Sequence, residues 1–189
     1  MTKEEVLKTK ITRLSPGDFY KEFVDLYDKT KWPPPDKSWT NDMFRNLRSM
    51  GKRFGYDVRM EVMRIDLTWH VELPNTNFIE LALEYEDSAD SPDKIVEEVR
   101  NKLVHIKSYL KCVIGYFDKK ADQLYDTVKE IEDVISAVKI EDPAQWLLIF
   151  IKTLKKGRYN AAELLGFSKD PTQKSFQQIG SKIVNVRRK

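Results

Sequence analysis

The spacing of apolar residues predicts two helices at the start of the chain. Apolar side chains recur at helical spacing over residues 16–28 and again from Thr40 to Phe54, as on the buried face of a helix. Gly55 is placed to end the second helix, and the proline-rich segment KWPPPDKSW lies between the two. We therefore expect residues 1–40 to form an N-terminal helix and connector, followed by a core with a C-terminal extension over 41–189.

The pattern then changes to the alternation that is typical of strands. Apolar and polar residues alternate from Val58 to Leu73, with a phase shift at Met63–Arg64 that indicates a bulge or a tight turn. The turn-forming residues PNTN follow at 74–77. Alternation resumes from Ile79 to Tyr85, so this part of the chain predicts a β-hairpin.

Helices and buried strands alternate in the rest of the chain. Helical spacing predicts helices over about 92–110 and 121–139, and short apolar runs predict buried strands at 112–117 and 146–153. The segment SFQQIGSKIV indicates a last strand, and VRRK a tail. This order predicts an α/β fold, with a mixed central sheet that contains a β-hairpin and is flanked by helices.

Three acidic residues fall on the polar face of the predicted hairpin. Because side chains alternate along a strand, Asp66 faces the same side as Glu84 and Glu86. The register that matches the apolar faces places Asp66 opposite Glu84 or Glu86. Three carboxylates this close repel one another unless a cation lies among them, and oxygen ligands suit Mg²⁺, Mn²⁺ or Ca²⁺. A solvated sheet face with scattered acids would show the same pattern.

Around these residues the chain resembles the PD-(D/E)xK nuclease superfamily, which has the restriction-endonuclease-like fold. The resemblance covers about residues 41–153 and depends on RID at 64–66, LALEYE at 81–86, and the helix and strand that follow. It places the family's first acidic motif on Asp66 and its (D/E)xK motif on Glu84-Tyr85-Glu86. Glu86 thus replaces the family's lysine, as in some type II restriction enzymes that remain active.

The resemblance implies a metal-dependent nuclease that acts on phosphodiester bonds of nucleic acid, with DNA as the expected partner. Asp66, Glu84 and Glu86 would be the catalytic and metal-binding residues, and Mg²⁺ or Mn²⁺ the cofactor. In the family the lysine positions or activates the attacking water. Here Lys102 or Lys107 would have to replace it, since both flank the apolar stripe of the next helix.

Two other hypotheses fit the same residues. Without the motif lysine, the chain could be a catalytically inactive nuclease-fold protein that binds nucleic acid or protein. It could also be an unrelated α/β interaction protein whose acids are only solvated. Many nucleases of the family act as dimers, which leaves a homodimer open. An acid that the family often carries before the hairpin has two candidates here, Asp42 and Glu61.

Composition narrows the class of protein without choosing among these hypotheses. Hydrophobic residues make up 41% and charged residues 33% of the 189 residues, which excludes a disordered chain. The net charge is only +3, so nucleic-acid binding would depend on a local basic surface. Basic residues flank the acids at Arg45, Arg48, Lys52, Arg53, Arg59 and Arg64, and others follow the last buried strand at Lys152, Lys155, Lys156 and Arg158. They could neutralise phosphates, and an ordinary charged surface would show the same pattern.

The single cysteine and the short apolar runs indicate the cellular compartment in which the protein is expected. Cys112 excludes a disulfide within the monomer and a cysteine-built zinc site, and its apolar surroundings predict a buried thiol. The first residues, MTKEEVLKTK, lack the apolar segment of a signal peptide. The longest apolar run, Trp146–Ile151, is too short to span a bilayer. We expect a cytoplasmic protein with no membrane partner.

Overall fold

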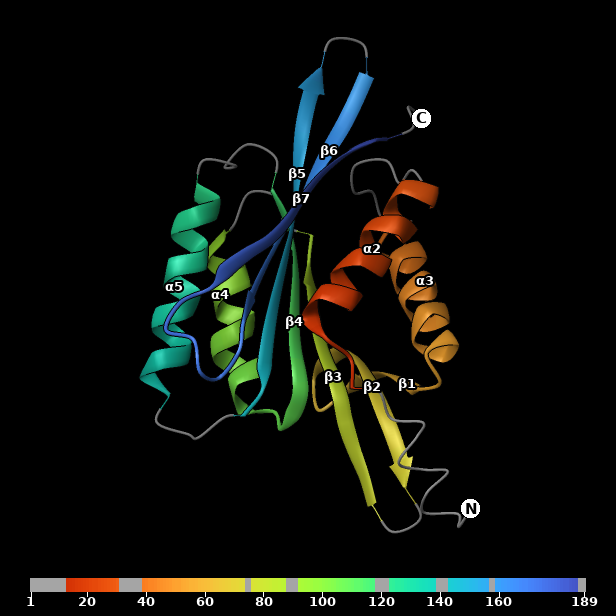
Figure 1. The fold of residues 1–189 in the computed structure, drawn as a ribbon, viewed down its shortest axis with the longest axis vertical. Coiled ribbons are helices and arrows are strands. Elements are labelled where there is room, and N and C mark those ends of the chain that lie inside the picture. The colour runs from red at the N-terminus through yellow and green to blue at the C-terminus, as the bar shows by residue number, and fades with distance from the viewer. Residues whose placement is uncertain are drawn as a thin grey trace.

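In the residues that the structure describes, seven strands form one mixed sheet (Figure 1). The structure is a computed structural model, and it describes residues 13–30, 39–73, 76–87, 92–117, 123–138, 143–156 and 159–186. The strands follow one another across the sheet in chain order, from β1 to β7. The predicted α/β class, with helices on a mixed sheet, is confirmed. The proline-rich connector lies outside the described residues.

The direction of pairing changes twice across the sheet. The strands are β1 (Asp57–Val62), β2 (Ile65–Leu73), β3 (Thr76–Glu86), β4 (Ser108–Phe117), β5 (Gln145–Lys156), β6 (Tyr159–Lys169) and β7 (Gln177–Asn185). β1, β2 and β3 pair antiparallel, β3, β4 and β5 pair parallel, and β5, β6 and β7 pair antiparallel. The parallel centre needs crossover connections, and helices supply them.

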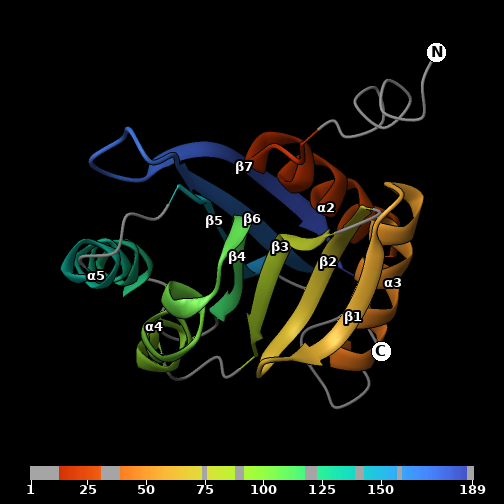
Figure 2. The same cartoon turned by 90° about the horizontal axis from the view of Figure 1, so that it is seen from below.

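Helices cover both faces of the sheet (Figures 1 and 2). α2 (Pro16–Thr30) and α3 (Trp39–Arg53) lie on one face, and α4 (Pro92–Asn101) and α5 (Leu124–Ala137) lie on the other. Each face carries its own apolar core, as expected for a sheet between two helical layers. None of the described helices is both long and apolar enough to cross a bilayer.

The N-terminal helix α2 packs directly on the sheet. Ser15 caps it by accepting a hydrogen bond from Asp18 N at 3.0 Å, and Phe19 and Phe23 are fully buried. The Tyr20 hydroxyl donates to the carbonyl of Leu164 in β6 at 2.8 Å. The helix predicted over 16–28 is therefore confirmed, and it covers β5, β6 and β7.

The phase shift at Met63–Arg64 is a two-residue turn. Val62 of β1 pairs with Ile65 of β2, so only Met63 and Arg64 lie between the two strands. Both have positive φ, 53° and 67°, the conformation that two-residue hairpin turns need. Residues with a Cβ adopt it at a cost of about 1 kcal/mol or more each.

The register of β2 with β3 agrees with the prediction near the acids and departs from it further out. Leu67 pairs with Leu83, and Trp69 with Leu81. A register shift follows between Trp69 and His70, and beyond it Ile79 packs against the core under α4 and α5. The prediction that Ile79 shares a face with Leu81 and Leu83 is therefore wrong, because a bulge reverses the alternation.

Ile65 also departs from the predicted face. It packs in the core under α4 and α5, whereas Leu67 and Trp69 pack under α2 and α3. Ile65 directly follows the two-residue turn, and the regular alternation of β2 begins only after it. The faces of the hairpin follow the prediction only from Leu67 to Trp69 and from Leu81 to Tyr85.

Two element boundaries were predicted wrongly in the second half. α4 ends at Asn101, a short 3₁₀ turn follows, and β4 begins at Ser108, whereas the helical pattern extends to 110. Ser108 and Leu110 instead pair with Ile79 and Leu81 of β3. Strand pairing thus overrides the local helical pattern here.

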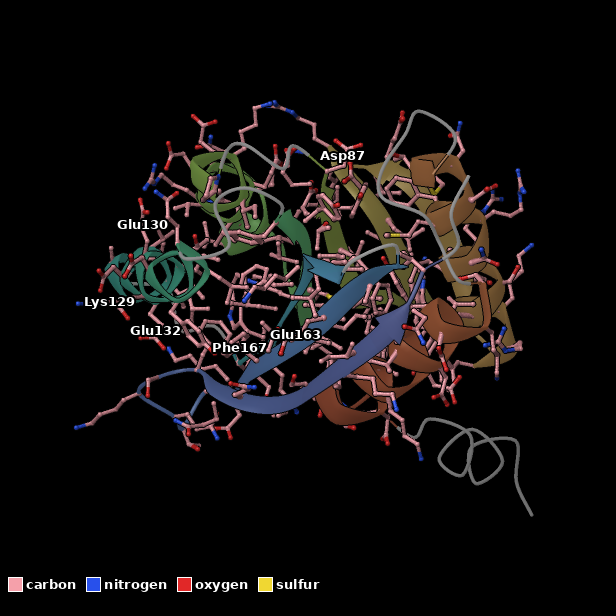
Figure 3. The ribbon with its side chains drawn as sticks, turned by 90° about the horizontal axis from the view of Figure 1, so that it is seen from above. Asp87, Lys129, Glu130, Glu132, Glu163 and Phe167 are labelled. Atoms are coloured by element: carbon pink, nitrogen blue, oxygen red, sulfur yellow. The ribbon has the colours of Figure 1, made fainter. Side chains whose placement is uncertain are left out.

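β6 was not predicted at all. It pairs with β5 along its whole length, so contacts with a distant segment decide its conformation. The segment before β7 is held against α5, because Glu132 accepts a hydrogen bond from Phe176 N. Figure 3 shows Glu132 on α5 beside β6 and β7. Tyr125 of α5 also meets Phe167 of β6 edge to face, at a ring separation of 5.8 Å.

Gly115 of β4 lets α4 approach the sheet. A Cβ at Gly115 would lie 2.6 Å from Ile95 Cδ1 and 3.1 Å from Phe150 Cδ1. We expect Gly115→Ala to reduce the free energy of unfolding by about 1–3 kcal/mol, because the core is overpacked. Ile95→Val removes the methyl group that clashes, so it should cost less in the Gly115→Ala background than alone. Urea unfolding of the four proteins measures this coupling, and strict additivity would contradict the packing argument.

Candidate active site

Asp66 and Glu84 lie side by side where β2 and β3 meet. Asp66 N donates to Glu84 Oε1 at 3.2 Å, and Tyr85 N donates to Asp66 Oδ2 at 2.9 Å. Each carboxylate therefore accepts a hydrogen bond from the backbone of the other strand. The predicted juxtaposition of Asp66 and Glu84 is present, and main-chain groups hold it in place.

The segment around the end of α4 adds an ammonium group and a third carboxylate. Lys102, which directly follows α4, donates from Nζ to Glu84 Oε2 at 2.9 Å. The same ammonium pairs with Glu98, four residues earlier on α4, a spacing that places two side chains on one helix face. Glu84 is 1% exposed and Lys102 19% exposed. We call Asp66, Glu84, Glu98 and Lys102 the acid–lysine cluster.

The acid–lysine cluster carries more negative charge than its lysine can neutralise. If all three acids were ionised, three carboxylates and one ammonium would leave a net charge of −2. Burial and the charge of Asp66 raise the pKa of Glu84 to about 8, despite the opposing effect of Lys102. Burial also raises the pKa of Asp66. The site therefore takes up either a proton or a cation at neutral pH.

Lys102 stays charged in this group. Burial alone would lower its pKa, but hydrogen bonds to Glu98 and Glu84 raise the pKa of Lys102 to about 12. The ammonium is thus a fixed positive charge, and Asp66 and Glu84 are the groups whose pKa values are raised. A proton near neutral pH resides on the pair Asp66 and Glu84, which share the most buried part of the site.

The raised pKa of Glu84 predicts how stability depends on pH. Its ordinary value is 4.5, so the folded state binds the proton more tightly than the unfolded chain. The resulting stabilisation is complete below about pH 4.5 and is lost as the pH rises through about 8. We expect the free energy of unfolding to fall by about 2–4 kcal/mol between these limits.

Urea unfolding as a function of pH measures this fall. Glu84→Gln should flatten the curve, because the amide does not titrate, and should exceed wild type in stability at pH 8.5. Glu97→Gln, at an exposed neighbour on α4, is the matched control and should keep the wild-type slope. A wild-type slope in Glu84→Gln would contradict the assignment.

Glu86 and Lys107 lie elsewhere. Glu86 is half-buried two residues further along β3, where it pairs in register with Gly115 of β4. Two residues of a strand span about 7 Å, which separates the backbone position of Glu86 from that of Glu84, where Asp66 N and Lys102 Nζ donate. Lys107 is exposed just before β4. Of the two lysines that the sequence offered, the structure brings Lys102 to the acids.

The donor atoms of Asp66 and Glu84 suit a hard divalent cation. Among the residues that the structure describes, no three carboxylate, histidine or cysteine side chains are arranged to hold a metal ion. Mg²⁺, however, is often bound by one or two carboxylates and completes its shell with water and substrate phosphates. The buried Glu84 and the half-buried Asp66 carry surplus negative charge and fit that requirement, so Asp66 and Glu84 are the residues that would hold the metal.

Glu98 is the member of the acid–lysine cluster that the sequence did not predict. Its signal was present, because an acid four residues before Lys102 on a helix indicates an ion pair. The pair alone does not show which part of the sheet it faces. Only the packing of α4 on β3 and β4 places it over Glu84.

Several of the predicted basic residues are paired with acids. Arg45 pairs with Asp42, Arg53 with Glu22, and Arg59 with Asp57 and Glu72. Such exposed pairs leave less positive charge for a phosphate backbone. Arg64 is exposed in the turn between β1 and β2, and the side chains of Lys155, Lys156 and Arg158 lie outside the described residues.

His70, Cys112 and Glu61 occupy defined places. His70 is buried, and its ring nitrogens are hydrogen-bonded to Thr68 Oγ1 and Asn77 Oδ1. Cys112 is fully buried as predicted, and burial raises the pKa of its thiol well above the ordinary value. Glu61 is exposed in β1, level with Asp66 in the register of β1 and β2.

Comparison with known proteins adds no relative. No protein-family model matches the chain, and no curated protein sequence matches it. A buried and a half-buried carboxylate, both hydrogen-bonded, together with a charged lysine can bind a cation, orient a water molecule and contact an anionic substrate.

Proposed function

We propose that this protein is a metal-dependent nuclease that hydrolyses phosphodiester bonds of DNA at the acid–lysine cluster. The observation that carries the proposal is the 2.9 Å contact between Lys102 Nζ and Glu84 Oε2, next to Asp66 on the paired strand. It joins a charged lysine to the two acids at the positions of the PD-(D/E)xK motif. Lys102 takes the role of the motif lysine that Glu86 replaces.

Each residue has a distinct role in this proposal. Asp66 and Glu84 would hold Mg²⁺ or Mn²⁺. When bound, such an ion lowers the pKa of a water ligand and stabilises the charge of the cleaved phosphodiester. The ammonium of Lys102 orients the attacking water and keeps its positive charge throughout. Glu98 positions Lys102 from one side, so that the ammonium stays within reach of Glu84.

The order of elements supports the restriction-endonuclease-like fold as part of the proposal. A helix, α3, precedes the antiparallel strands β1, β2 and β3, and α4 then leads to the parallel strand β4. Asp66 near the start of β2 and Glu84 near the end of β3 meet at one place in this arrangement. The same order runs through the segment on which the resemblance depends.

Incubation of the purified chain with DNA tests the proposal. Linear duplex, single-stranded and supercoiled DNA are incubated with Mg²⁺, with Mn²⁺, with Ca²⁺ and with a chelator. We expect cleavage with Mg²⁺ or Mn²⁺ and none with the chelator. Absence of cleavage under all metal conditions would contradict the catalytic function, and cleavage in the chelator would contradict the role of the metal.

A catalytically inactive binding protein is the second candidate, and one observation favours it. Both oxygens of Glu84 already accept hydrogen bonds, one from Asp66 N and one from Lys102 Nζ. These protein donors compete with a metal ion for the lone pairs of the same two oxygens. DNA binding that is unaffected by divalent metal, together with no turnover, would support this candidate.

A further inference from the structure

The turn between β1 and β2 has a backbone conformation that its residues disfavour. Met63 and Arg64 adopt φ of 53° and 67°, and Glu61, two residues earlier, adopts 54°. In this left-handed region the Cβ of an L-residue crowds the following carbonyl oxygen. Two-residue hairpin turns therefore favour Asn-Gly or Asp-Gly. The chain instead carries a long side chain at each of the two positions.

These side chains do not contribute to the core. Met63 is 72% exposed, the largest fraction among the large apolar side chains that the structure describes as exposed. Arg64 is exposed, and no ion pair involving it occurs within the described parts of the chain. Folding thus gains nothing evident from either residue. Local rules broken without a structural benefit are typical of functional sites.

The turn is next to the acid–lysine cluster. Arg64 precedes Asp66 by two residues, about 7 Å along an extended chain. Ile65 between them is fully buried in the core that also contains Val96 and Val99 of α4, so the turn is anchored beside that helix. Figure 2 shows the β1–β2 turn near the end of β3 and on the side of α4.

We propose that the β1–β2 turn, through Met63 and Arg64, binds the DNA strand beside the phosphodiester that is cleaved. The inference rests on the proposed function and names the element that positions its substrate. The guanidinium of Arg64 pairs with a phosphate oxygen, and the exposed Met63 packs against a deoxyribose or base, as apolar side chains do in minor grooves. The left-handed backbone directs both side chains outward from the strand ends.

Replacing the turn by Asn-Gly separates this role from a structural one. We expect M63N/R64G to raise the melting temperature by about 3 °C or more, because the new turn suits the backbone. The same variant should bind a 20-base-pair duplex in Ca²⁺ at least about eightfold more weakly at 0.1 M salt, since one phosphate contact is lost together with the contact of Met63. The slope of log binding constant against log salt should fall by about 0.9. Its cleavage in Mn²⁺ should fall in kcat/KM by a similar factor.

Two further variants make the test specific. Arg64→Lys keeps the charge and should restore most of the salt slope, whereas M63N alone should weaken binding and leave the slope unchanged. Lys182→Gln removes an exposed cation from β7, at the opposite end of the sheet, and should change neither binding nor cleavage.

The outcomes distinguish this inference from the proposed function. If wild type cleaves DNA and M63N/R64G cleaves and binds equally well, the inference is wrong and the nuclease function stands. If M63N/R64G melts below wild type, the argument from backbone strain is wrong and the inference with it. If wild type neither binds nor cleaves DNA, the proposed function fails, and the inference fails with it.

Discussion

Glu84→Gln should abolish DNA cleavage and leave the protein folded. Glu84 offers two carboxylate oxygens in a site where it is 1% exposed, and the amide keeps the shape while it removes the charge that would hold the metal. Loss of a metal ligand costs several kcal/mol of transition-state stabilisation, so we expect single-turnover cleavage in Mn²⁺ to fall at least about a thousandfold. Unfolding measured in parallel should show a protein at least as stable as wild type at pH 8.

Substitutions at two other acids provide the comparison variants for this experiment. Glu97→Gln changes an exposed acid on the same helix as Glu98 and should retain wild-type cleavage. Glu86→Gln tests whether Glu86 is a metal ligand, as its position in the linear motif implies, or lies too far along β3 to be one, as the observed geometry implies. We expect a loss within about tenfold, because Glu86 lies about 7 Å further along the strand from Glu84. A loss as large as that of Glu84→Gln would show that Glu86 is a ligand.

Lys102→Met should lower both cleavage and stability, and the loss of stability should depend on pH. The ammonium offsets the charges of Glu84 and Glu98, and without it three carboxylates face one another. Removing one partner of a buried ion pair costs about 3–5 kcal/mol. Lys102 is 19% exposed, so water compensates in part, and we expect about 2–3 kcal/mol at pH 8. Cleavage should fall about a hundredfold or more, as when a group that orients the reactants is displaced.

The sign of the pH effect follows from Glu84. Lys102 lowers the pKa of Glu84, so its removal raises that pKa further, and the folded variant binds a proton more tightly. Its stability should therefore approach wild type at pH 5 and diverge from it as the pH rises toward 8.

Three further variants complete the test of Lys102. Lys102→Arg retains the charge and should recover stability more fully than cleavage, and Lys107→Met should resemble wild type in both. Added E98Q should recover part of the stability lost in Lys102→Met, because it removes one of the unpaired charges. A pH-independent loss of stability in Lys102→Met would show that its contribution is packing and not charge.

The pair Asp66 and Glu84 could be predicted from the sequence because it depends on local rules. Alternation decides which face of a strand a residue occupies. Matching apolar faces across a short hairpin allows only a few registers. The observed pairs of Leu67 with Leu83 and of Trp69 with Leu81 are among those expected. No distant part of the chain was needed to bring these two acids together.

The positions of Lys102 and Glu98 in the acid–lysine cluster were decided by the tertiary structure alone. Lys102 and Lys107 were equivalent as flanking residues of one predicted helix, but α4 ends at Asn101 and the chain then turns into β4. Lys102 directly follows the helix and contacts Glu84. Lys107 lies further along the chain, just before β4. Glu98 joins the cluster because α4 packs closely on the sheet above Gly115, a contact between segments that no local pattern encodes.

The features that the sequence did not show share one physical reason. β6 is a strand because β5 pairs with it, and Ser108 to Leu110 extend β4 because β3 is their neighbour. The bulge beside Trp69 turns Ile79 to the other core. Periodicity along a chain records which side of an element is apolar. Whether a segment is paired, where its register shifts and which helix covers it are decided by contacts between residues far apart in the sequence.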